Sequence, residues 1–228
     1  MRRLRTLNSF GRIGIGGQPW GWKGGGGDVG VVPCPLVDTF TDADGTLLSA
    51  HAPNVNEFAG IYASFASGGP LPIGDIQGNR ARIQDNGDGN TRGFEIECGI
   101  ADGILVLETF TNAIAGGWLG LCFRSDGLTR WTARHESTFN RAVLFDPDGI
   151  LVDNQALVIN PTDQIDLILT LAGTSVSCIV RNVTTAVQVT VATVSAKNLA
   201  ATIHGITIRT VFGAGAGDFF DNLQVCRP

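Results

Sequence analysis

Two carboxylates in one short segment are the nearest that this sequence comes to the paired acids needed for glycoside hydrolysis. Glu95 and Glu97 alternate with apolar residues in GFEIECGI, so a strand would place both carboxylates on one face. A retaining glycosidase needs two carboxyl groups about 5–5.5 Å apart, with separated pKa values. The same alternation describes the solvent face of a half-buried strand, which is the simpler interpretation. We therefore expect Glu95 and Glu97 to be surface residues and the protein not to be an enzyme.

Other constellations that carry chemistry are missing from the sequence. It has no G-x-S-x-G motif, no phosphate-binding loop and no dinucleotide fingerprint. Its three histidines, His51, His135 and His204, lie in unrelated contexts. The five cysteines form no C-x-x-C pair, and no histidine lies at metal-ligand spacing, which argues against zinc. We expect no cofactor.

Calcium is the ion that the sequence supports best, as a structural ion. Asp42 and Asp44 lie in DADG, and Asp85 and Asp88 lie in DNGDGN, so both segments offer clustered oxygen ligands. Neither segment fits a complete EF-hand loop. Asp and Asn also favour turns for conformational reasons alone, which is the competing interpretation.

A sugar-binding platform would need exposed aromatic rings with polar neighbours. In TRWTARH, Trp131 falls on one face of the expected strand, and Arg130 and Arg134 fall on the other. Residues 36–228 contain only two other rings of the types most used for stacking on sugars, Trp118 and Tyr62. Trp131, Arg130 and Arg134 are thus the ligand-binding candidates, although a lone tryptophan is more often a core residue.

The first 35 residues differ in composition from the rest of the chain. Residues 1–27 contain five basic residues and no acidic one, which is a charge of +5, so residues 28–228 carry −10 and the chain as a whole carries −5. The segment is too rich in glycine to fold alone. It is either a flexible tail whose tryptophans fold back, or an arm that becomes ordered on a partner, which we favour. The partner-binding candidates are Arg2, Arg3, Arg5, Arg12, Trp20 and Trp22.

The elements that must position these residues are strands throughout residues 36–228. Short apolar or alternating runs recur about every ten residues, separated by Gly, Asp, Asn or Pro. No segment shows helical periodicity over ten residues, apart from a turn expected near Thr111–Ala115. This pattern predicts one all-β jelly-roll sandwich at 36–228, preceded by an extended arm at 1–35. No apolar run is long enough to span a bilayer.

Four of the five cysteines divide into two groups. Cys98 and Cys178 alternate with apolar residues and are expected to be buried thiols. Cys34 and Cys226 flank the sandwich and could lie close together, because the end strands of a jelly roll often pair. A disulfide between them is not implied, since the odd number of cysteines fits assembly in a reducing cytoplasm.

Several segments resemble concanavalin A-like, laminin-G-like jelly rolls over roughly residues 36–228. They are GWLGLCFRSDGLTRWTARHE, DQIDLILTLAGTSVSCIVRNVTTAVQVT and the closing HGITIRT…GDFFDNLQV. DTFTDADGTLLSAHAPNV is similar to the opening strand of such domains in phage virion proteins. The resemblance implies the fold, and it makes Asp221 a further calcium candidate. The resemblance says little about function, because the family includes lectins, carbohydrate-binding modules, glycosidases, adhesion domains and virion proteins.

The preferred hypothesis is a bacteriophage virion structural protein, a capsid decoration or a tail or fibre component, assembled in the host cytoplasm. Its arm would bind other virion proteins, such as the major capsid or a tail protein, and the sandwich would form homo-oligomers. Nucleic acid is an unlikely partner because the body is acidic. The alternatives are a carbohydrate-binding or adhesion module that binds a surface glycan, and a glycosidase-like enzyme that depends on Glu95 and Glu97.

Overall fold

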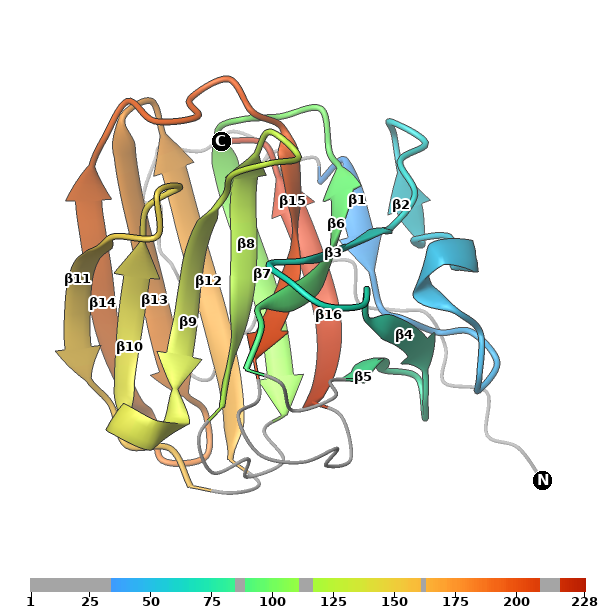
Figure 1. Ribbon diagram of the computed structural model, residues 1–228, viewed down its shortest axis with the longest axis horizontal. Coiled ribbons are helices and arrows are strands. Elements are labelled where there is room, and N and C mark those ends of the chain that lie inside the picture. The colour runs from blue at the N-terminus through green and yellow to red at the C-terminus, as the bar shows by residue number, and fades with distance from the viewer. Residues whose placement is uncertain (1–33, 85–88, 111–116, 161–162, 210–217) are drawn as a thin grey trace, which may run out of the picture. The chain divides into compact units, whose positions relative to one another are not determined.

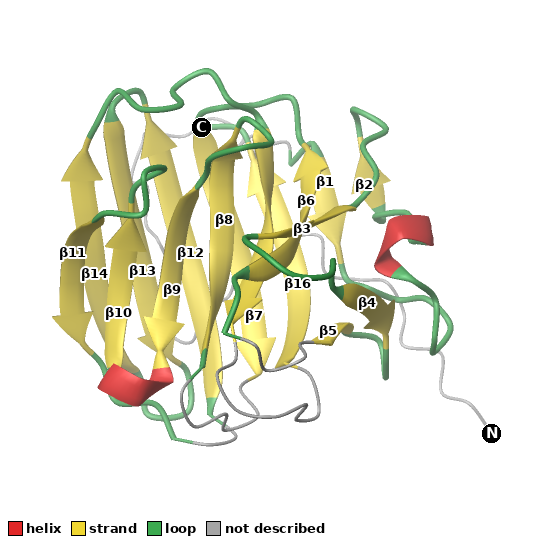
Figure 2. Ribbon diagram, viewed as in Figure 1, coloured by secondary structure: helices red, strands yellow, loops and turns green. Residues whose placement is uncertain are grey.

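The structure is a computed structural model that describes residues 34–84, 89–110, 117–160, 163–209 and 218–228. Within these ranges the chain forms strands and two 3-10 helices, Leu48–Ala50 and Ser137–Phe139, with no α-helix (Figure 2). The chain divides into two units, Met1–Pro33 and Cys34–Pro228. The first unit lies outside the described residues, as does the turn expected at Thr111–Ala115.

The strands form two antiparallel sheets that face each other (Figure 1). The larger sheet has nine strands. They are β1 (Leu36–Asp38), β2 (Val55–Asn56), β4 (Ile73–Ile76), β5 (Ala81–Gln84), β7 (Gly103–Phe110), β12 (Gln164–Ala172), β13 (Ser175–Asn182), β14 (Val187–Val194) and β16 (Asp218–Cys226). Their main order is β14-β13-β12-β7-β16-β1-β2, while β5 pairs with both β16 and β4.

The second sheet has seven strands in the order β11-β10-β9-β8-β15-β6-β3. They are β3 (Ala63–Ala66), β6 (Arg92–Glu97), β8 (Trp118–Ser125), β9 (Trp131–Glu136), β10 (Arg141–Phe145), β11 (Leu151–Ala156) and β15 (Ile203–Arg209). This order places β8, β15 and β6 side by side, so the pocket described below is formed by segments far apart in the sequence.

The core fills the space between the sheets, and period-2 alternation selects its residues. On β8, Leu119, Leu121 and Phe123 belong to the core cluster, whereas Trp118 and Cys122 lie on the outer face of the seven-stranded sheet. Burial of such apolar side chains contributes roughly 1.5–3 kcal/mol each. The alternation read from the sequence was therefore a reliable guide to the core, and the predicted all-β jelly-roll sandwich is confirmed.

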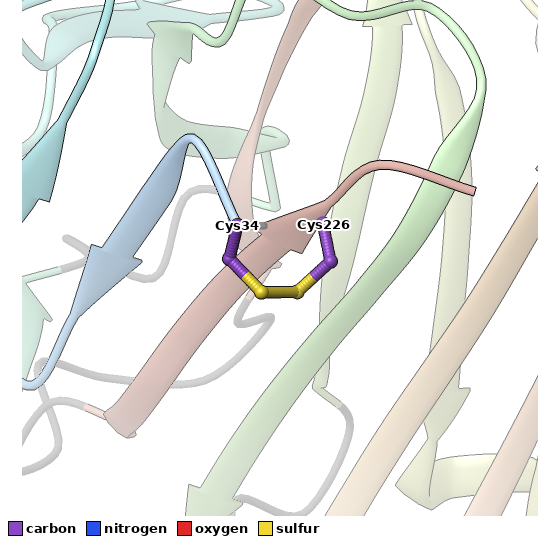
Figure 3. The surroundings of a disulfide bond; sticks show 2 residues. All are labelled: Cys34 and Cys226. Carbon is purple, nitrogen blue, oxygen red and sulfur yellow. A yellow bond between two sulfur atoms is a disulfide. The ribbon is translucent and has the colours of Figure 1, made fainter. Parts of the chain in front are cut away.

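The two ends of the folded body are joined to each other. β1 pairs with β16 in the register Leu36↔Val225, and a disulfide links Cys34 to Cys226 (Figure 3). The question left open by the sequence is thus answered in favour of pairing. Cys98 and Cys178 are free and buried, as predicted.

No helix in the described part of the chain is long and apolar enough to cross a membrane.

Candidate ligand-binding pocket

An open pocket of about 620 Å³ lies at one end of the seven-stranded sheet. It lies where β6 and β8 end and where the segment after β14 returns to begin β15. Its lining residues are Glu97, Ser125, Asp126, Asn198, Leu199, Ala200, Ala201, Thr202 and Ile203. A volume of this size falls in the range of small-molecule sites.

Loop 195–202 forms one wall of the pocket and is fixed by polar contacts. Asn198 adopts a left-handed conformation with φ 53°, which asparagine tolerates better than most residues. Its Nδ2 donates to the backbone O of Arg124 and to Oγ1 of Thr129, both at 3.1 Å. The Trp131 indole N–H donates to the backbone O of Lys197 at 3.1 Å. These contacts tie the loop to β8, to β9 and to the turn between them, so the wall is preorganised.

A lysine provides the loop with another anchor. Lys197 Nζ bonds to Asp148 Oδ2 at 2.6 Å and also to Asp146, both in the turn between β10 and β11. The carboxyl group of Asp146 also accepts the Ile150 amide at 2.9 Å. The hydrogen bonds to Lys197 and to the turn outweigh burial and lower the pKa of Asp146. The turn therefore presents a carboxylate to the lysine at neutral pH.

The charged groups of the pocket lining are two carboxylates, Glu97 and Asp126, and its other polar side chains are the hydroxyls of Ser125 and Thr202 and the amide of Asn198. Asp126 accepts the amides of Thr129 at 2.7 Å and Leu128 at 2.9 Å, and these hydrogen bonds lower the pKa of its carboxyl group. Glu97 Oε1 accepts the Gly99 amide at 2.7 Å. Among the residues that the structure describes, no lysine or arginine lines the pocket. A ligand would therefore meet two carboxylates beside the apolar side chains of Leu199 and Ala200.

The ring predicted for a sugar platform is in the core. Trp131 has an exposed fraction of 0% and stacks on Phe123, with ring centroids 6.1 Å apart. It cannot stack on a sugar in this position, so the idea of an exposed platform at Trp131 is corrected, and the core alternative is confirmed. Its contribution to the pocket is indirect, through the hydrogen bond to Lys197.

Arg130 and Arg134 lie on the outer face of the seven-stranded sheet, opposite to Trp131 as expected. Arg134 stacks on the rings of Trp118 and Phe145 at 3.9 and 4.0 Å, and it pairs with Glu136 at 2.8 Å. Its burial lowers the pKa of the guanidinium to about 10. The two arginines do not join Trp131 in one site.

The two carboxylates considered for hydrolysis have separate partners. Glu95 is only 7% exposed, because Arg130 stacks on Phe65 at 3.8 Å and pairs with Glu95 at 3.3 Å. The Arg130–Glu95 pair crosses the sheet over Cys122 and Gly205, and these residues are small enough to leave room for it. Glu95 is therefore not the solvent-facing residue that the sequence suggested. Glu97, partly exposed, lines the pocket instead.

The calcium candidates do not converge. Asp42 bonds to His51 Nδ1 at 2.7 Å, and Asp44 accepts the Gly78 amide at 2.7 Å. Asp221 lies opposite Glu108 in the ladder, and burial raises the pKa of its carboxyl group to about 6. Among the described residues no group of three or more His, Cys, Asp or Glu side chains could hold a metal ion. Asp85 and Asp88 lie outside the described residues.

The arm residues also remain untested. Arg2, Arg3, Arg5, Arg12, Trp20 and Trp22 lie outside the described residues, so their role in partner binding stays a prediction.

A buried polar network near β1 was missed by the sequence analysis. Asp38, with an exposed fraction of 0%, bonds to His51 Nε2 and to the Tyr62 hydroxyl, both at 2.8 Å. Burial alone would lower the pKa of His51, but the bonds to Asp38 and Asp42 outweigh it and raise the pKa. The network fixes the chain that leaves β1. The only sequence signal was polar residues spaced irregularly between short strands.

Comparison with known proteins identifies the fold. No protein-family model matches the chain, and no curated protein matches it. Among solved structures, the VIP36 exoplasmic/lumenal domain in a Ca²⁺/Man2-bound form matches with a TM-score of 0.50 and 6% identity, over 80% of this chain and 86% of that one. Winged bean acidic lectin matches with a TM-score of 0.48 and 8% identity, over 72% and 96%. Laminarinase from Flavobacterium sp. UMI-01 matches with a TM-score of 0.45 and 10% identity, over 68% and 81%. Together with the two antiparallel sheets, the match to VIP36 identifies the domain as a concanavalin A-like jelly roll.

Proposed function

We propose that the protein is a carbohydrate-binding module whose ligand occupies the pocket between Glu97, Asp126 and loop 195–202. The observation that carries the proposal is the preformed pocket itself. Asn198 and Lys197 anchor its wall through the hydrogen bonds described above, so little ordering would be needed when a ligand binds.

The chemistry of the lining favours a particular class of sugar. Glu97 and Asp126 accept hydrogen bonds, and sugar hydroxyls or an ammonium group can donate them. The side chains of Leu199, Ala200 and Ala201 offer apolar contact to the C–H face of a pyranose ring. The proposed ligand is a neutral or amino sugar, because an acidic sugar would bring its carboxylate close to two others.

The absence of catalysis is part of the same proposal. Arg130 pairs with Glu95, and Glu97 accepts a hydrogen bond from the Gly99 amide, which supports separate structural roles for the two carboxylates. The VIP36 domain is found in a Man2-bound form, but at 6% identity this likeness concerns the fold, and the proposal depends on the pocket.

The virion hypothesis remains as the second candidate function. It depends on the basic arm, Arg2 to Lys23, with its two tryptophans. The Cys34–Cys226 disulfide favours an oxidising environment, such as an extracellular or virion surface, over a persistently reducing cytoplasm. Removal of residues 1–30 followed by an assembly assay with the remaining virion proteins would test this function independently of any glycan.

A glycan array followed by titration of the best binder tests the main proposal. Ala200 is exposed and lines the pocket, so Ala200→Trp should fill it and weaken binding at least about tenfold. Ala196→Trp is the matched control, since Ala196 is an exposed alanine of the same loop that does not line the pocket. A full array without binding, or equal affinity of the two variants and the wild type, would overturn the proposal.

A further inference from the structure

Two edge strands from different sheets lie next to each other at one side of the sandwich. β14 ends the nine-stranded sheet and β11 ends the seven-stranded sheet, and the two strands contact each other (left side of Figure 1). Among the described residues, no strand pairs with the outer side of β14. Its unpaired backbone groups are therefore available in principle to another chain.

β14 has few of the features that normally protect an edge strand. Its sequence, VQVTVATV, contains no charged residue, no proline and no glycine. It pairs with β13 over eight residues without a bulge, from Val187↔Asn182 to Val194↔Ser175. Val187 and Val194 are 51% and 77% exposed. A long, regular and uncharged edge of this kind is a template for strand addition.

One outward backbone group of β14 is capped by a side chain from the other sheet. The Ala192 amide donates to Asp153 Oδ2 of β11 at 2.8 Å. In an antiparallel ladder, alternate residues direct both backbone groups to the same side. The backbone N–H and C=O groups therefore point away from β13 at Gln188, Thr190 and Val194, as they do at Ala192. An incoming strand would need to place a carbonyl oxygen where the Asp153 carboxylate already lies, and the two would repel.

We propose that Asp153 is a gatekeeper that prevents β14 from pairing with β14 of a second copy of this chain. A second copy is the occupant that fits, because the uncharged strand has no like charges to repel itself. In an antiparallel register with Val191 opposite its own copy, Thr190 lies opposite Ala192, and both of these residues have outward-facing backbone groups. The outward backbone N–H and C=O groups of Thr190 in one copy would then pair with those of Ala192 in the other.

Sedimentation velocity across a range of concentrations tests this proposal. Asp153→Ala removes the cap and should raise the self-association constant at least about tenfold, whereas Asp153→Asn keeps an acceptor oxygen and should resemble the wild type. Thr190→Lys added to Asp153→Ala should restore the wild-type behaviour by placing a charge on the edge. Asn154→Ala, at the next residue of β11, is the matched control.

Two outcomes would overturn the proposal. One is an Asp153→Ala variant that sediments like the wild type at every concentration. The other is association of Asp153→Ala that Thr190→Lys does not reverse, which would place the contact elsewhere. Circular dichroism would establish that each variant is folded. If Asp153→Ala does not fold, Asp153→Thr makes the same comparison, because threonine favours strands but is too short to reach Ala192.

Discussion

The opening segment of the domain and the pocket wall both depend on polar contacts, but the contacts differ in kind. Near β1, Asp38 and His51 are almost completely buried, and a covalent bond joins Cys34 to Cys226. In the pocket wall, Asn198 and Lys197 are partly exposed and hold a loop beside an open hollow. The first region is built to hold the fold together, and the second to keep a surface in one shape. Variants of the first should therefore change stability, and variants of the second should mainly change binding.

Loss of the disulfide should produce the largest effect on stability. Cys34 and Cys226 are separated by 192 residues, and a cross-link that closes so long a loop restricts the unfolded chain strongly. Cys34→Ser with Cys226→Ser should lower the free energy of unfolding by about 2–5 kcal/mol, measured by urea denaturation. Affinity for the pocket ligand should not change. Reductant should destabilise the wild type by a similar amount and leave the double variant unaffected; equal sensitivity of both proteins would contradict this account.

Removal of the buried carboxylate should come next. Asp38 accepts hydrogen bonds from the Phe40 amide and the Tyr62 hydroxyl, and it faces one nitrogen of His51. Asp38→Asn should lower the free energy of unfolding by about 3 kcal/mol, because it removes the negative charge that the buried Tyr62 hydroxyl and His51 ring contact. Asp42→Asn is the matched control. Its carboxylate is 46% exposed and should contribute less than about 1 kcal/mol. If Asp42→Asn lowered the free energy of unfolding more than Asp38→Asn does, burial would not be what makes the Asp38 contact the stronger of the two.

The loop anchor should give a smaller change in stability with a larger change in binding. Asn198→Ala removes the bonds to Arg124 and Thr129 and places alanine at φ 53°. We expect a loss of about 1–2 kcal/mol of stability and a loss of at least about tenfold in ligand affinity. Asn198→Gly accepts the backbone conformation, so it should recover part of the stability but little of the affinity. Unchanged affinity in both variants would show that the anchor does not shape the site.

The smallest effect is the pH dependence contributed by His51. Its pKa is raised in the folded protein, so its contribution is fully present below the unfolded value of about 6.5 and is lost as pH rises through the folded value. The difference in unfolding free energy between the wild type and His51→Gln should therefore shrink from pH 5.5 to pH 9, by less than about 1 kcal/mol. His135 and His204 have lowered pKa values that act in the opposite direction, and they cancel in this difference. A difference that grows with pH would contradict the assignment.

The sequence predicted local pattern well and spatial assembly poorly. Alternation around Glu95 placed Phe94 and Ile96 in the core, because the period of a strand is local information. It could not reveal that Arg130 crosses two strands to cover Glu95, since that contact depends on the order of strands in the sheet.

The same limit applies to the pocket. Asp126 was identifiable as a turn residue from SDGLT, and Asn198 from its neighbours alone was not identifiable at all. The pocket joins positions 97, 125–126 and 198–203, which only the fold brings together. The pairing of Cys34 with Cys226 was similarly open until β1 was found beside β16.

The disulfide also determines how the domain would carry a mechanical load. The chain preceding Cys34 and the residues following Cys226 are attached on either side of one covalent bond. A tensile force between the two chain ends would pass through that bond and bypass the hydrogen-bonded ladders of both sheets. The sandwich would then stay folded when tension is applied to its termini. After reduction of the disulfide, the same tension would act on the hydrogen-bonded strands themselves.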